Sequence, residues 1–300
     1  MSGPAARIAA QAKLNLYLRV LNREESGYHT IETVFHRIEH ADELLVAVED
    51  HRQRTLDVVG GDLGPVTSNL AYRAAVAYQD AAGWPRGFTI ELEKNIPVGA
   101  GLGGGSADAA AVLRALDSLS RAPLGQRRLL SIAAALGADI PFLMSGEVMA
   151  LAWGRGERML ALPHLPERDV LLVVPKFRVA TIDAYAWLDQ DRSRLGGTGE
   201  YETADLLLAT EQVLADWHDL ANLSRNSFLN PVAARHPNLR PLLEQLKKAD
   251  AFLCGMSGSG STLFGIFEKP IGSAATPKFE GAETIATRTS RQVVQPIRIG

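Results

Sequence analysis

The sequence predicts a protein of the α+β class, with strands and helices packed in layers and divided between two domains. Segments with strand-like alternation are interspersed with segments rich in helix formers, a mixture typical of layered α and β elements. The chain has 300 residues, which is enough for two ordinary domains that each bury a core. A polar linker with two prolines at 163–168 marks the predicted boundary. We therefore expect domains at 1–162 and 163–300, with the part after 269 the least certain.

The first predicted strand, residues 13–21, places two polar side chains on one face. Leucine or valine alternates there with polar residues, so Lys13 and Asn15 point the same way. They can therefore reach one site, although a solvated lysine at a strand end is the simpler interpretation of Lys13. Further strands are predicted at 31–38, 42–49, 56–59 and 88–92, and a helix from Ser68 or Asn69 to Ala82 that ends at Gly83.

A glycine cluster follows the 88–92 strand and precedes a helix predicted at 107–119. Five glycines fall within seven residues, and Ser106 stands at the expected N-cap. Glycines let successive backbone N–H groups face one concavity, and a helix N-terminus favours an anion. The pattern predicts a phosphate-binding loop, with a flexible turn before a capped helix as the alternative.

Two well-known classes of phosphate loop fit this segment poorly. A Walker loop needs Lys and then Ser or Thr after its last glycine, and Gly105 is followed by Ser106 and Ala107. Gly99, Gly101 and Gly104 do satisfy the dinucleotide pattern G-x-G-x-x-G. The acidic residue expected about twenty positions later is missing, because residues 124–125 are Leu and Gly. The dinucleotide interpretation is therefore disfavoured but remains open.

An aspartate stands between a helix end and a proline in the next segment. A helix is predicted at 125–136 and ends at Gly137, and Asp139 follows in apolar company. A carboxylate in such surroundings needs an N–H group or a cation, so Asp139 either caps a helix or pairs with a positive group. A hairpin is predicted next, with strands at 148–152 and 158–162.

The second half of the chain repeats the mixture of strands and helices. Strands are predicted at 169–174, 251–254, 263–267 and 284–289; helices at 181–187, capped by Thr181, and at 203–217, 231–236 and 239–248. Residues 222–230 are predicted to be irregular, and 272–278 poor in apolar content. A second glycine-rich stretch, 255–262, opens no helix, so we expect its small residues to approach the backbone of the first loop or its ligand.

Composition excludes several function classes. Hydrophobic residues make up 46% and charged residues 22%, as in an ordinary globular protein. The net charge is −3, which gives no reason to expect nucleic acid as a partner. No apolar leader and no long apolar run are present, so no membrane association and a cytoplasmic location are predicted. The single cysteine, Cys254, excludes an internal disulfide and is predicted to be a buried structural thiol.

A polar turn at 22–30 offers a possible ligand contact. Tyr28 presents a flat ring for stacking, and His29 presents ring nitrogens for hydrogen bonds. Either residue could equally be a packed structural one.

Taken together, these motifs resemble the GHMP family of small-molecule kinases. Residues 97–111 resemble the family's ATP loop and 256–262 its third motif. Residues 12–16, 27–29, 137–142 and 154–157 resemble the branch that acts on 4-diphosphocytidyl-2-C-methyl-D-erythritol. The match runs in order from residue 7 to about 267. It implies the two-domain GHMP architecture: two-layer α/β sandwiches, the N-terminal domain ribosomal-protein-S5-domain-2-like and the C-terminal domain ferredoxin-like.

The resemblance also implies an activity. The γ-phosphate of ATP is transferred to the 2-hydroxyl of that substrate, a step of the non-mevalonate (MEP) isoprenoid pathway. Lys13 and Asp139 match the catalytic pair, with Asp139 accepting the hydroxyl proton and Lys13 keeping it ionised. The implied ATP contacts are Pro97, Val98, Gly99, Ala100, Gly101, Leu102, Gly103, Gly104, Gly105, Ser106 and Ala107. Mg²⁺ is expected with ATP, held mostly by phosphates and water, with Ser106 as a candidate protein ligand.

The cytidyl diphosphate sugar alcohol is expected to meet a second set of residues. Tyr28 is implied to stack on the base and His29 to bond its edge; the other candidates are Asn15, Thr181 and Tyr185. Ala107 departs from the family pattern, which usually has a second serine there, so weaker or rearranged nucleotide contacts are expected. Alternatives are another GHMP kinase, acting on homoserine, mevalonate or a sugar, or a non-catalytic nucleotide-binding protein on this fold. A monomer or weak homodimer is expected.

Overall fold

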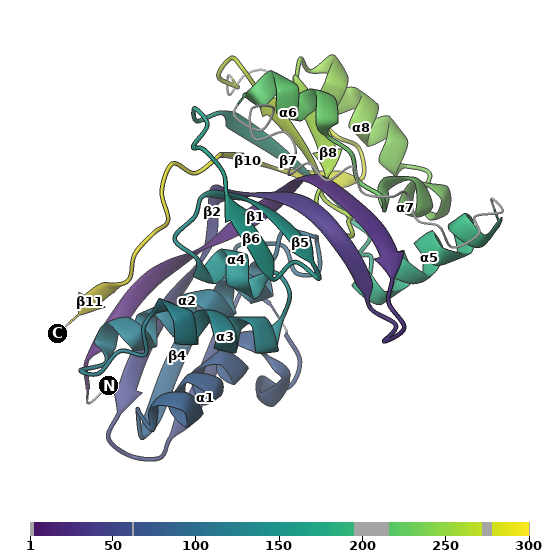
Figure 1. Ribbon diagram of the computed structural model, residues 1–300. Helices are drawn as coiled ribbons and strands as arrows, with labels where there is room; N and C mark the ends of the chain where they lie inside the picture. The colour runs from purple at the N-terminus through teal and green to yellow at the C-terminus, as the bar shows by residue number, and fades with distance from the viewer. Residues whose placement is uncertain (1–2, 62, 195–215, 272–277, 300) are drawn as a thin grey trace.

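Two β-sheets with separate sets of helices form the molecule. The computed structural model describes residues 3–61, 63–194, 216–271 and 278–299. One sheet carries α1 to α4, and the other lies with α5 to α8 in the second lobe (Figure 1). The predicted α+β class is confirmed, with two sheets that each have their own helices.

The first sheet has seven strands, all antiparallel except for one pair. Its path runs β11-β1-β2-β4-β3, with β5 paired to β2 and β6 to β5, and only β3 and β4 are parallel. Its strands are β1 (Ala5–Arg23), β2 (His29–Glu49), β3 (Arg54–Val59), β4 (Gly87–Glu93), β5 (Met149–Gly154), β6 (Arg158–Ala161) and β11 (Ile297–Ile299). Dinucleotide-binding folds use a parallel, doubly wound sheet, so that alternative for the glycine loop was wrong.

The strands predicted at 31–38 and 42–49 are a single long strand, β2. The strand continues through an irregularity in its pairing with β1: Ala41 faces Gln11 and Arg37 faces Lys13, so three residues of β2 stand opposite Ala12 alone. The predicted hairpin is confirmed as β5 and β6. The boundary at 163–168 stays a prediction: β1 to β6 precede it and β7 to β10 follow it, while β11 returns to pair with β1.

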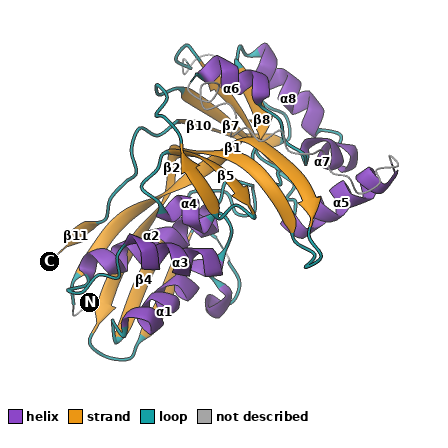
Figure 2. Cartoon of the chain, in the orientation of Figure 1, coloured by secondary structure: helices purple, strands orange, loops and turns teal. Residues whose placement is uncertain are grey.

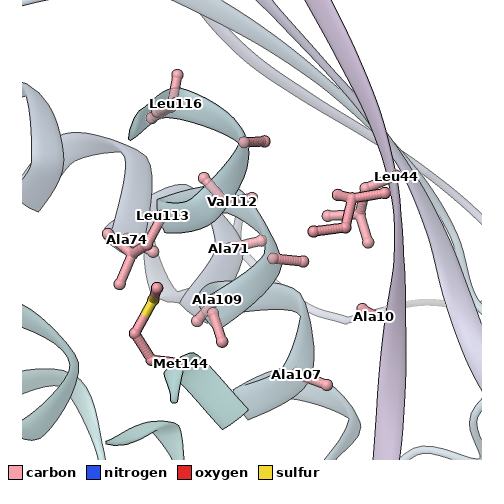
Figure 3. Packing of buried hydrophobic residues seen from close by; sticks show 14 of the residues in the cluster. Ala10, Leu44, Ala71, Ala74, Ala107, Ala109, Val112, Leu113, Leu116 and Met144 are labelled. Atoms are coloured by element: carbon pink, nitrogen blue, oxygen red, sulfur yellow. The ribbon is translucent and has the colours of Figure 1, made fainter. Parts of the chain in front are cut away.

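Helix α2 lies at the centre of the first core. The helices here are α1 (Leu70–Ala82), α2 (Gly104–Leu119), α3 (Gln126–Leu136) and α4 (Ile140–Met144), with a short 3-10 turn at Val66–Ser68. Figure 3 shows Val112 and Leu113 of α2 packed in the cluster that also holds Ala71 of α1 and Leu44 of β2. The many alanines of α2 let it approach its neighbours closely, and this fixes the glycine loop at its N-terminus.

The second sheet is antiparallel, in the order β10-β7-β9-β8. Its strands are β7 (Asp169–Pro175), β8 (Leu253–Met256), β9 (Leu263–Phe267) and β10 (Ala282–Arg288), accompanied by α5 (Thr181–Arg194), α6 (Trp217–Leu223), α7 (Leu229–Arg235) and α8 (Leu239–Lys248) (Figure 2). The helix predicted to cap at Thr181 instead includes Thr181 and continues to Arg194. The helix predicted at 203–217 falls almost wholly outside the described residues, and Trp217 begins α6. Helix α6 was not predicted, because the polar residues at 222–230 suggested irregular structure.

The long strands β1 and β2 join the two lobes (Figure 1). Leu18 of β1 exchanges backbone bonds with Arg225 (2.8 Å) and Ser227 (2.9 Å) of the second lobe. On β2, Arg37 accepts a bond from the backbone N–H of Ser290 at 3.0 Å. The lobes are thus held together by backbone pairing as well as by side chains.

Cys254 is half-buried, and not buried as predicted, at the edge of the hydrophobic cluster of the second lobe; this partial burial raises the pKa of its thiol to about 11. A thiol that ionises so weakly is a poor nucleophile, in agreement with the structural role predicted for it. Within the described part of the chain, no helix has the length and apolar character needed to cross a membrane.

Candidate active site

The glycine loop enters α2 through alternating left-handed residues. Gly99, Gly101 and Gly103 have φ of 70°, 82° and 72°, a conformation costly for residues with a Cβ. Gly103 is the N-cap of α2, so the helix begins two residues before Ser106. The prediction that Ser106 is the N-cap was therefore wrong: Gly104 and Gly105 extend the helix instead of the loop. Ser106 lies in the first turn and still lines the cavity described below.

The second glycine stretch touches the first, as predicted. A Cβ on Gly101 would lie 2.2 Å from the carbonyl oxygen of Ser257, so only glycine fits there. The hydroxyl of Ser257 donates to the carbonyl of Gly101 at 2.9 Å, and the N–H of Thr262 donates to the carbonyl of Ala100 at 3.2 Å. The second lobe thereby holds the loop of the first lobe in place.

Lys13 lies beneath this loop and is buried. Shifts in the pairing of β1 with β2 occur on both sides of Lys13 and Asn15, between residues 11 and 13 and between 15 and 17. Such bulges re-aim side chains and are common beside active sites. The Lys13 stem passes so close to Gly103 that a Cβ there would lie 2.9 Å from Cε. The solvated-lysine interpretation was therefore wrong.

The Lys13 ammonium has three acceptors for its three protons. Nζ lies 3.1 Å from Oδ2 of Asp139, donates to Oδ1 of Asn15 at 2.6 Å and donates to the carbonyl of Gly101 at 3.3 Å. Since an ammonium has three donors, these partners fix its orientation. The burial cost of the charge is thus offset by a carboxylate and two dipoles.

Asn15 is itself oriented by a chain of hydrogen bonds. Thr33 donates its hydroxyl proton to the carbonyl of Tyr17 at 2.6 Å, so its oxygen accepts from Nδ2 of Asn15 at 2.8 Å. This leaves Oδ1 of Asn15 facing Lys13. In the structure the amide of Asn15 serves the lysine, and its contact with substrate stays a prediction.

Asp139 is positioned at the start of α4. It precedes Ile140 as the N-cap residue but makes no side-chain capping bond, so its carboxylate is left for Lys13. The buried guanidinium of Arg37 donates to the carbonyls of Phe142 and Leu143, both at 2.9 Å, and so holds the other end of this short helix. The Asp139 side chain keeps 31% of its surface exposed, against 3% for Lys13. The carboxylate is thus the accessible member of the pair.

Two cavities meet at Asp139. One, of about 570 Å³, is lined by residues 97–106 together with Lys13, Asn15 and Asp139. The other, of about 1500 Å³, is lined by Tyr28, His29 and Asp139. Thr181 and Tyr185 line both cavities. Ala107, in contrast, is buried in the core and lines neither, so a nucleotide contact by its side chain is not supported.

The larger cavity carries the aromatic residues predicted to bind a base. Tyr28 is 60% exposed in its turn, and the Arg155 guanidinium lies 4.0 Å from its ring centroid. His29 stacks on Tyr185, with ring centroids 4.5 Å apart. Burial, with a smaller contribution from the charge of Asp139, raises the pKa of the Tyr185 phenol to about 12, so it stays protonated. One face of each ring is therefore covered, that of Tyr28 by Arg155 and that of Tyr185 by His29, and Tyr28 is the more exposed of the two.

A second buried lysine beside the loop was not anticipated from the sequence. Lys94 contacts Asp42 and lies 2.8 Å from Oδ2 of Asp108, and all three side chains are at most 4% exposed. Lys94 and Asp108 line the smaller cavity. Burial, reinforced by Asp42 and opposed by Lys94, raises the pKa of Asp108 to about 8. The one sequence feature that could have pointed to this cluster is Asp108, a charged residue that interrupts a run of alanines.

Comparison with known proteins identifies the family. The profile described as "GHMP kinases N terminal domain" matches residues 69–147, and "GHMP kinases C terminal" matches residues 206–277. A 4-diphosphocytidyl-2-C-methyl-D-erythritol kinase from Solibacter usitatus is 38% identical over 263 residues, covering 87% of this chain and 81% of the relative. The chain belongs to the 4-diphosphocytidyl-2-C-methyl-D-erythritol kinase family. Another relative of the same name, from Deinococcus radiodurans, is 40% identical over 258 residues, 86% of this chain and 82% of its own.

Solved structures agree with this family assignment. A crystal structure of a 4-(cytidine 5'-diphospho)-2C-methyl-D-erythritol kinase superposes with a TM-score of 0.76 at 35% identity, covering 94% of this chain and 98% of that one. A homoserine kinase from Cytophaga hutchinsonii, with a TM-score of 0.69 at 18% identity and coverage of 100% and 98%, shares the fold alone. The two-domain GHMP architecture predicted from the sequence is therefore confirmed.

Proposed function

We propose that this protein transfers the γ-phosphate of ATP to the 2-hydroxyl of 4-diphosphocytidyl-2-C-methyl-D-erythritol, giving the 2-phosphate and ADP. The observation that carries the proposal is the position of Asp139 at the junction of two cavities. A phosphate loop lines one cavity, and aromatic residues suited to a base line the other. A donor and an acceptor bound in these cavities would meet at this carboxylate.

The chemistry follows from the Lys13 and Asp139 pair. Asp139 takes the proton of the acceptor hydroxyl as the oxygen attacks the γ-phosphorus, and ADP leaves with the bond electrons. Lys13, 3.1 Å away, holds the carboxylate of Asp139 in place and supplies positive charge beside the transferring group. Phosphoryl transfer depends mainly on positioning and charge stabilisation, which a buried and fully hydrogen-bonded lysine provides.

ATP binds at the loop in this proposal. Residues 97–106 present backbone N–H groups and the N-terminus of α2, which suit phosphate. Mg²⁺ bound together with ATP would supply charge neutralisation for the phosphates. Among the described residues no group of three or more His, Cys, Asp or Glu could hold a metal ion by itself. The Ser106 hydroxyl, which lines the cavity, fits a single protein ligand for an ion held mainly by ATP and water.

The acceptor binds in the larger cavity in this proposal. Tyr28 stacks on the cytosine through its exposed face, and His29 bonds the edge of the base. Thr181 and Tyr185 line both cavities, and Asn15 lines the smaller one; these three residues would contact the sugar alcohol or its phosphates.

Substrate comparison tests the proposal. ADP release is measured with Mg²⁺ATP and, in turn, diphosphocytidyl methylerythritol, methylerythritol phosphate, mevalonate and homoserine. We expect turnover with the cytidyl compound alone. Turnover with another acceptor would leave the roles of the glycine loop and Asp139 standing but would overturn the base site at Tyr28 and His29. Absence of turnover with all four compounds would favour a non-catalytic nucleotide-binding protein. A cytoplasmic location and a monomeric or weakly dimeric state remain predictions.

A further inference from the structure

Helix α5 clamps the ring of His29 from two sides. Tyr185 and Asp189 are four residues apart and so lie on one face of the helix. Tyr185 stacks on the imidazole, and Oδ1 of Asp189 lies 2.9 Å from its Nε2. His29 comes from β2 and α5 from the other lobe, so the ring is held across the junction between the lobes.

Asp189 determines which nitrogen of His29 carries the proton. An ionised carboxylate only accepts hydrogen bonds, so Nε2 must be the protonated nitrogen. In the neutral ring, Nδ1 then has a free lone pair, and the described residues give it no hydrogen-bond partner. His29 lines the larger cavity, where the base is proposed to bind. The ring thus presents an acceptor to that base.

Cytosine and uracil differ in what they offer to such an acceptor. Cytosine carries an amino group at C4, a donor, whereas uracil carries a carbonyl oxygen, an acceptor. We propose that Asp189 is a positioning residue that sets base selectivity, holding His29 in the tautomer whose Nδ1 accepts from the cytosine amino group and repels the uracil oxygen. This inference rests on the proposed function and names the residue that makes its acceptor pocket selective.

Arg23 makes the inference testable by a single substitution. Its Nη1 lies 3.5 Å from Oδ2 of Asp189, the oxygen that His29 does not use. The Arg23 side chain has only hydrogen-bond donors. In Asp189→Asn it therefore binds the side-chain amide oxygen, and the amide NH₂ group turns toward Nε2 of His29. Nε2 must then accept, the proton moves to Nδ1, and the ring presents a donor to the base. Asp189→Glu keeps an acceptor and should keep the original tautomer.

Two measurements at about pH 8, where an imidazole is ordinarily neutral, test the inference. The first is the ¹⁵N spectrum of histidine-labelled protein, with the His29 signals assigned by their loss in His29→Gln. The second compares kcat/KM for the cytidyl substrate and for the analogue that carries uracil. Asp191→Asn is the matched control, because Asp191 lies on the same helix and pairs with Arg235 at 3.1 Å.

We expect the wild type and Asp189→Glu to show a protonated Nε2 and to prefer cytosine. Asp189→Asn should show a protonated Nδ1 and lose about ten- to a hundred-fold of that preference, mainly through KM. An unchanged tautomer in Asp189→Asn, or an inverted tautomer with unchanged base preference, overturns the inference. Failure of the wild type to phosphorylate either compound contradicts the proposed function instead, and the ¹⁵N spectra still report whether Asp189 positions His29.

Discussion

Two buried lysines lie on either side of the glycine loop, and they differ in the exposure of their partners. Lys13 pairs with Asp139, which keeps 31% of its side-chain surface exposed. Lys94 pairs with Asp42 and Asp108, which are 0% and 2% exposed. Both lysines are about equally buried, at 3% and 4%. What distinguishes the two sites is therefore the access of a ligand to the carboxylate.

The Lys94 site is built to join segments of chain. Oδ1 of Asp42 accepts from the backbone N–H groups of Asn95 at 2.6 Å and Ile96 at 2.8 Å, just before the glycine loop. Lys94 then connects Asp42 on β2 to Asp108 on α2. The same type of ion pair thus anchors the loop on one side and, on the other, leaves a carboxylate open to the cavity. Substitution of Lys94 should therefore mainly lower stability, whereas substitution of Lys13 or Asp139 should mainly lower turnover.

Removing the charge of Asp139 should have the largest effect. In Asp139→Asn the side chain keeps its shape but cannot take the acceptor proton, so kcat should fall by at least about 10³-fold. ATP binding, measured by the thermal shift with Mg²⁺ATP, should stay within about two-fold of the wild type. Asp80→Asn, an exposed position on α1, is the control. Turnover of Asp139→Asn near the wild-type rate would remove Asp139 as the base.

Removing the charge of Lys94 should act on stability. In Lys94→Met the buried carboxylate of Asp42 loses its cation, and breaking such a pair costs about 3–5 kcal/mol. Urea unfolding measures this loss. A fall in kcat with an unchanged midpoint of unfolding would contradict the structural role and place Lys94 in the chemistry.

The corresponding change at Lys13 should act on turnover first. Lys13→Met leaves Asp139 partly solvated, so the free energy of unfolding should fall by less than in Lys94→Met. The loss of positive charge beside the transferring phosphoryl group should lower kcat by about 10²-fold. Steady-state kinetics and urea unfolding on both variants give the comparison. Equal losses of stability would show that exposure does not separate the two sites.

The last prediction concerns the pH dependence of stability. Burial raises the pKa of Asp108 to about 8, so the folded protein keeps this proton well above the pH at which an unfolded aspartate loses it. Between these values the folded state binds more protons, and the free energy of unfolding falls as pH rises from about 4 to 8. Asp108→Asn removes this contribution and should flatten the fall. Identical slopes for the variant and wild type, measured by urea unfolding from about pH 5 to 8, would contradict the assignment.

Local sequence patterns predicted most of the elements and part of the site. A helix is predicted from Ser68 or Asn69 to Ala82, and the structure has Asn69 as the N-cap of α1 and Gly83 in the left-handed conformation. Alternation placed Lys13 and Asn15 on one face, and a bulge on each side keeps them there. The start of α2 was misplaced because glycine, a poor helix former, was assigned to the loop, whereas packing of α2 against the sheet carries the helix back to Gly104.

The sequence by itself determined the glycine loop, the alternating strands and the order of the motifs, because these depend on neighbouring residues along the chain. Only the tertiary structure decided that Lys13 is buried, that Asp139 faces two cavities and that Asp189 meets His29, 160 residues away in sequence. Burial and charge pairing depend on which segments meet in space. Asp42 on β2, Lys94 directly after β4 and Asp108 on α2 come from three separate segments, and no local sequence pattern indicates that they meet.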